Sequence, residues 1–144
     1  MATVTATIDI DATPGEILDV LADLEHYPTW SSVHRRARIQ DVDTHGRPKR
    51  ATMTVSAAGL SDEQVLDYSW KTNSVSWTLV SSGQQKNQRG RYVITKDGQQ
   101  HSHVQYELTI DPIFPVPGII VRRVMGRAVS AATEGLKRRV ESGG

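Results

Sequence analysis

Three polar side chains are the candidates for chemistry inside this protein. Arg35, Ser81 and Gln88 each share the alternation parity of apolar residues on their own predicted strand, so the pattern turns them inward. An enzyme would use such groups as an acid, a base or a positioned hydrogen-bond donor. All three lie near strand ends, however, where polar side chains usually form a solvated rim. We therefore expect no catalytic set among them.

The other residues with reactive or metal-binding side chains are isolated. None of the five histidines has an acidic neighbour at the spacing of metal ligands. These are His26, His34, His45, His101 and His103. The sequence also has no glycine-rich phosphate loop and no nucleophile elbow. We expect neither a metal nor a cofactor.

Bulky apolar side chains gather on the inward face of the predicted strands. They include Met53, Tyr68, Trp70, Trp77, Tyr92 and Tyr106. A helix near the C-terminus turns Met125 and small residues such as Ala128 and Ala132 towards them. These residues could be an ordinary packed core, or they could line an apolar ligand cavity with a few polar groups. The small helix residues either draw the helix close or leave volume, and the pattern alone permits both.

The longest element is the predicted C-terminal helix, residues 117–141. Apolar residues recur on one side of it with the period of an amphipathic helix. At ~1.5 Å per residue it spans roughly 36 Å, the width of a small domain. Near the other end of the chain, residues 3–11 alternate like a half-buried strand. Thr13, Pro14 and Glu16 then predict a capped helix start, and Pro28 predicts its end, with a second short turn over residues 24–32.

Residues 33–111 have a period of two almost throughout. Turn signals at residues 45–48, 58–59, 72–74, 82–83 and 97–98 divide them into six antiparallel strands. An antiparallel sheet with one apolar face must cover that face, and only the C-terminal helix is long enough. The 144 residues therefore predict one α+β domain with a helix-grip fold. Its curved seven-stranded antiparallel sheet wraps round the long C-terminal helix, with two short helices between strands one and two.

Residues 8–32 resemble the opening of the START-like, or Bet v 1-like, superfamily. The similar pieces are Ala12-Thr13-Pro14 at the helix start and the Tyr27-Pro28-x-Trp30 segment. The branch most similar to this chain is the bacterial polyketide cyclase/dehydrase and lipid-transport group. Members bind hydrophobic molecules between the sheet and the long helix, and they include lipid carriers and aromatic polyketide cyclases. The resemblance therefore favours a cavity over a filled core.

On this resemblance, the chain is expected to bind a lipid or other hydrophobic small molecule as a carrier or sensor. The alternatives are a polyketide cyclase or aromatase, and an interaction module with a filled interior. Sparse inward polar groups favour the first. The expected ligand-binding residues are Trp30, Arg35, Met53, Val55, Tyr68, Trp70, Trp77, Leu79, Tyr92, Tyr106, Leu108, Phe114, Val121, Met125 and Ala128.

Composition limits the other partners. The formal net charge is +1, from 17 basic and 16 acidic residues, which gives no general reason to expect nucleic-acid binding. No apolar run approaches the ~20 residues of a membrane span, and the first residues do not form a signal peptide. We expect a soluble, cytoplasmic monomer.

One segment suggests peripheral membrane contact. Residues 112–121 carry three prolines within six residues, so neither a ladder strand nor a helix interior fits there. Ile113, Phe114 and Val116 then sit beside Arg122 and Arg123 at one mouth of the sheet. The apolar side chains either fold back as a plug over the core, which we favour, or form an exposed lip that touches an anionic membrane.

Overall fold

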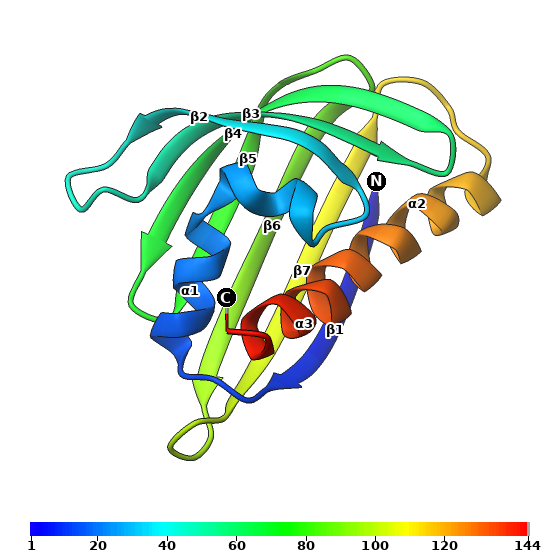
Figure 1. Ribbon diagram of the computed structural model, residues 1–144. Helices are drawn as coiled ribbons and strands as arrows, with labels where there is room; N and C mark the ends of the chain where they lie inside the picture. The colour runs from blue at the N-terminus through cyan, green and yellow to red at the C-terminus, as the bar shows by residue number, and fades with distance from the viewer. Residues whose placement is uncertain (144) are drawn as a thin grey trace.

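A curved antiparallel sheet with a long helix across its open face forms the protein (Figure 1). The computed structural model describes residues 1–143. The seven strands follow the order β1-β7-β6-β5-β4-β3-β2, which confirms the predicted helix-grip fold. The strands are β1 (Ala2–Ile10), β2 (His34–Val42), β3 (Pro48–Ala57), β4 (Leu60–Lys71), β5 (Ser74–Ser82), β6 (Gln85–Lys96) and β7 (Ser102–Pro112).

Two short helices connect β1 to β2, as predicted. Helix α1 (Pro14–Ala22) begins with the expected capping box, in which the Glu16 amide donates to Thr13 Oγ1 and the Thr13 amide donates to Glu16 Oε1. It ends at Ala22, however, and not at Pro28. Pro28 lies inside the 3₁₀ helix η1 (Leu24–Thr29), because the φ angle that proline imposes is also that of a 3₁₀ turn.

The sheet contains bulges that change which face the side chains occupy. In β2, the pairing with β3 shifts register between His34 and Arg36. In β4, the pairing with β5 shifts between Val65 and Leu66, which oppose Ser81 and Leu79. Each bulge places one extra residue in a strand, so the simple alternation of inward and outward residues fails locally.

The long C-terminal helix is continuous but not regular. It consists of α2 (Gly118–Ser130), a π turn η2 (Ala131–Gly135) and α3 (Leu136–Glu141). At the π turn the Tyr92 hydroxyl of β6 donates to the Ala132 carbonyl at 2.8 Å. A Cβ on Gly135 would lie 3.1 Å from the Trp30 carbonyl oxygen, so glycine lets the helix approach the end of η1 closely. These contacts fix the helix over the sheet.

The larger of the two core clusters includes the side chains where α1 and α3 meet the sheet. Ile10, Ile17, Leu21, Ile94 and Leu136 are fully or almost fully buried there. A second cluster, around Leu24 and Met53, packs η1 onto β3 and β4. The space under α2 is left to the aromatic side chains of the sheet.

Candidate functional site

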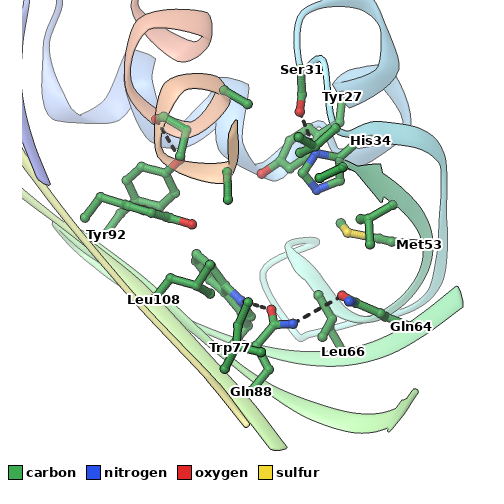
Figure 2. Close-up of a pocket in the computed structure, with 18 of the residues that line it drawn as sticks. Tyr27, Ser31, His34, Met53, Gln64, Leu66, Trp77, Gln88, Tyr92 and Leu108 are labelled. Atoms are coloured by element: carbon green, nitrogen blue, oxygen red, sulfur yellow. Dashed lines mark hydrogen bonds between the residues drawn. The ribbon is translucent and has the colours of Figure 1, made fainter. Parts of the chain in front are cut away.

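A hollow lies between the concave face of the sheet and the middle of the long helix (Figure 2). We call it the inner chamber. The volume in which the centre of a water molecule fits is about 130 Å³. One water needs only ~10–15 Å³ by this measure, so the chamber is more than a packing defect. No aspartate, glutamate, lysine or arginine is among the residues that line it. The lining residues are Tyr27, Trp30, Ser31, Val33, His34, Met53, Val55, Ala57, Gln64, Leu66, Tyr68, Trp70, Val75, Trp77, Gln85, Gln88, Tyr92, Tyr106, Leu108, Ile110, Val124, Ala128, Ala131 and Ala132.

Trp77 is the centre of the aromatic wall on the sheet side. Its ring centroid lies 6.0 Å from that of Tyr68, 5.9 Å from that of Tyr92 and 6.3 Å from that of Tyr106. Offset and tilted aromatic contacts at these distances are mutually stabilising. The four rings come from β4, β5, β6 and β7, so the curvature of the sheet brings them together.

A chain of amides forms the polar part of the same wall. Gln88 Oε1 accepts from Trp77 Nε1 at 3.0 Å. The Gln88 Nε2 group donates to Gln64 Oε1 at 3.3 Å and to Gln85 Oε1 at 2.9 Å. Gln64 and Gln88 are both buried, and Figure 2 shows them below the hollow. These bonds fix the Trp77 indole and engage both ends of the Gln88 amide.

His34 lies across the chamber, beside η1. Ser31 Oγ and His34 Nδ1 are 2.6 Å apart, and the Tyr27 ring contacts the imidazole edge-on at 5.1 Å between centroids. Burial lowers the pKa of His34 from 6.5 to about 4, so the ring is neutral at pH 7. Within residues 1–143 no hydrogen bond engages Nε2, which leaves this nitrogen available to a molecule in the chamber.

The tyrosines of the chamber are neutral donors. Burial raises the pKa of Tyr27, Tyr68, Tyr92 and Tyr106 above the ordinary value. Tyr27 donates to the Leu21 carbonyl, Tyr92 to Ala132, and Tyr68 contacts Met53 Sδ at 3.7 Å. The Tyr106 hydroxyl has no hydrogen-bond partner within the described part of the chain, so it is another polar group free to meet a ligand.

A second hollow adjoins the inner chamber under the first turns of α2. This outer chamber, of about 100 Å³ by the same measure, is bounded by Leu60, Gln84, Pro112, Val116 and Met125. It shares the side chains of Val55, Ala57, Gln64, Gln85, Ile110 and Val124 with the inner chamber. The two hollows therefore adjoin, and the outer chamber lies next to the segment before α2.

Most of the predicted binding residues lie on the inner chamber. These are Trp30, Met53, Val55, Tyr68, Trp70, Trp77, Tyr92, Tyr106, Leu108 and Ala128. Val121 and Met125 border the outer chamber instead. Leu79 borders neither hollow and packs on the second core cluster.

The inward direction predicted for two residues is wrong. Arg35 is exposed, because the bulge after His34 turns His34 towards the chamber in its place. Ser81 is also exposed, because the bulge between Leu79 and Ser81 reverses the alternation. Gln88 does point inward as predicted, but it is buried and not part of a solvated rim.

Phe114 is not a plug over the core. Its side chain is 65% exposed and borders a shallow surface hollow with Met1, Pro115 and Arg122. The prolines around it keep the segment outside the packed interior. The interpretation of the segment as a plug is therefore wrong.

Sequence reasoning missed His34 and Gln64 as chamber residues. Gln64 shares the parity of Leu66 on β4, so alternation alone could have found it. His34 could not be found in this way, because its inward direction depends on the bulge.

The sequence matches one known protein family over almost its whole length. A sequence model of the family described as polyketide cyclase/dehydrase and lipid transport matches residues 1–141. The chain belongs to this family. Comparison with curated proteins gives no significant match.

Solved structures similar to this family member show the same fold. A START superfamily protein from Mycobacterium smegmatis is 24% identical with a TM-score of 0.88, and the match covers 97% of both chains. An aromatase/cyclase from a Streptomyces species is 11% identical with a TM-score of 0.83, covering 97% of this chain and 93% of that one. A major latex-like protein from Panax ginseng is 10% identical with a TM-score of 0.71, covering 96% of each chain.

The family member also lacks two kinds of feature within residues 1–143. No helix there combines the length and the apolar character needed to cross a bilayer. In the same range, no three histidine or acidic side chains lie close enough together to hold a metal ion.

Proposed function

We propose that the protein binds a hydrophobic small molecule in the inner chamber, as a carrier or sensor. The observation that carries the proposal is the uncharged chamber itself, lined mostly by aromatic and aliphatic side chains. Within residues 1–143, its polar atoms without a hydrogen-bond partner include His34 Nε2 and the Tyr106 hydroxyl. Binding pockets for small molecules have this composition, with a few polar groups that orient the ligand. The match to a family that includes lipid transport in its description supports the proposal.

A neutral fluorescent probe, N-phenyl-1-naphthylamine, tests the proposal. We expect saturable binding at one site, accompanied by changes in intrinsic emission, because all three tryptophans of the chain border the inner chamber. Ala128→Phe fills the chamber from the helix side and should abolish binding. Ser130→Phe adds the same ring at an exposed position of α2 and should leave binding unchanged. Equal binding by both variants would place the probe elsewhere and overturn the proposal.

A polyketide cyclase-like activity is the second candidate. The neutral His34 Nε2 could accept a proton, and the Tyr106 hydroxyl could donate a hydrogen bond to a carbonyl oxygen. One fold neighbour is an aromatase/cyclase, but an 11% identity transfers no activity. Turnover of a polyketide mimic that is lost in His34→Gln and Tyr106→Phe would support this function. Binding without turnover would leave the carrier proposal alone.

A further inference from the structure

Three arginines surround a second, polar opening beside the inner chamber. Arg35 at the start of β2 and Arg123 and Arg127 on α2 border a pocket of about 350 Å³. Its other walls are Ser32 and Val33 before β2, together with residues 56–59 at the turn between β3 and β4. We call it the arginine pocket. The three arginines come from two elements that are far apart in sequence.

The positive charge in this pocket is not balanced by the protein. Within residues 1–143 the arginine ion pairs involve Arg47, Arg50 and Arg91, and none involves a pocket arginine. Arg123 and Arg127 are also four residues apart on one helix, where like charges repel one another. Arg35 adds a third cation to the same hollow. An anion in the pocket would remove this repulsion.

The arginine pocket and the inner chamber share two wall residues. Val33 and Ala57 border both hollows. Both side chains are small and apolar, so only a thin wall separates the two hollows here. An elongated molecule that crosses this wall would have one end in each hollow. The inner chamber offers a charged group no counter-ion, whereas the arginine pocket offers three. The two hollows therefore suit the opposite ends of one amphipathic molecule.

We propose that the natural ligand is an amphipathic anion, with its apolar body in the inner chamber and its carboxylate or phosphate head group in the arginine pocket. The planar guanidinium fork matches the oxygens of either group and forms charge-assisted hydrogen bonds with them. The inference rests on the proposed binding function and adds the charge and orientation of the ligand.

Three ligands with the same ten-carbon chain test the proposal. Decanol, decanoate and decyl phosphate are titrated by calorimetry at pH 7.5 and low salt against the full chain. The test variant is Arg123→Gln/Arg127→Gln. The control is Arg89→Gln/Arg138→Gln, which removes two exposed arginines that do not border the pocket and so changes the net charge equally.

We expect the wild type and the control variant to bind an anionic ligand at least tenfold more tightly than decanol. The pocket variant should bind decanol with unchanged affinity and lose the preference for the anion. The tighter of decanoate and decyl phosphate identifies the head group. The head-group inference alone is overturned if the pocket variant still prefers the anion to decanol. It is also overturned if the wild type binds decanol and the anions equally. If the wild type binds neither decanol nor the neutral probe, the proposed function is overturned as well.

Discussion

The Trp77 indole occupies the space that a side chain at position 90 would need. The two residues oppose one another in the β5–β6 pairing. A Cβ atom on Gly90 would lie 2.2 Å from Trp77 Cζ2 and 2.8 Å from Nε1. Gly90 therefore lets the indole lie against β6, where Nε1 reaches Gln88. The shape of the aromatic wall depends on this missing side chain.

Gly90→Ala should displace the indole and break its bond to Gln88. We expect the free energy of unfolding to fall by about 1–3 kcal/mol, as for other overpacked sites, and the tryptophan emission to shift. Chemical denaturation followed by fluorescence measures both. Gly126→Ala is the matched control, because nothing lies within 4 Å of a Cβ there. It lies on exposed helix and should stabilise the protein by about 0.5–1 kcal/mol. A Gly90→Ala variant with wild-type stability and emission would contradict this account.

Trp77→Ala should alter ligand binding more than it alters stability. Removing a closely packed tryptophan costs ~3–5 kcal/mol, but a side chain that borders a hollow should cost less. We expect a smaller loss and a several-fold change in affinity for N-phenyl-1-naphthylamine. Leu136→Ala is the contrasting variant, because Leu136 is fully buried away from the chamber. It should lose ~2–5 kcal/mol with unchanged probe affinity. If Trp77→Ala behaves like Leu136→Ala, Trp77 belongs to a closed core.

His34 should make the protein less stable in mild acid. Its pKa is about 4 in the folded protein, below the ordinary 6.5. Below pH 6.5 the unfolded chain binds a proton that folded His34 does not, so stability falls as the pH drops towards 4. Between pH 7.5 and pH 5 the loss should reach about 2 kcal/mol.

The variant His34→Gln should remove this part of the pH dependence, measured by urea denaturation at each pH. His45→Gln changes an exposed histidine in a turn and serves as the control. It should keep the wild-type profile. Identical profiles for all three proteins would show that the His34 ring is not held neutral by burial.

The exposed apolar side chains around the start of α2 should bind weakly to anionic membranes. Phe114 is 65% exposed and Ile119 is 54% exposed, and both lie near Arg122, which is also exposed. Apolar side chains beside cations suit an anionic lipid surface. We expect sedimentation with phosphatidylglycerol vesicles at low salt, weaker in Phe114→Ser and in Arg122→Gln and reduced by salt.

The control for the membrane experiment is Val80→Ser. Val80 is 45% exposed on β5, outside this segment, and its replacement should not change vesicle binding. Equal partitioning of all the variants at low salt would remove membrane contact as a function of the segment.

The fold was predictable because period and turn chemistry agree along most of the chain. The capping box at Thr13, the turn at Ala58 and Gly59, and the alternation along β7 each correspond to an observed element. The inward aromatic residues of the site followed from the same alternation. Trp77 and Tyr106, for example, both border the inner chamber.

The rest of the site depends on irregularities that alternation cannot reveal. Because of the bulge beside His34, His34 and not Arg35 points inward. Because of the bulge near Leu79, Ser82 and not Ser81 is the partly buried residue. The π turn at residues 131–135 contacts Tyr92 and Trp30, which lie far away in sequence. These features arise from tertiary contacts, so local sequence carries little signal for them.

The pairing of the first strand with the last sets the order in which the protein can fold. Ala2 opposes Ile110, and Ile10 opposes Ser102, so β1 has no sheet neighbour until β7 has left the ribosome. Such long-range closure carries a large loop entropy and slows folding. During synthesis the strands from β2 onwards can form hairpins one after another, while β1 remains unpaired. Until β7 is synthesised, the apolar face of β1 has no partner strand and is exposed to aggregation.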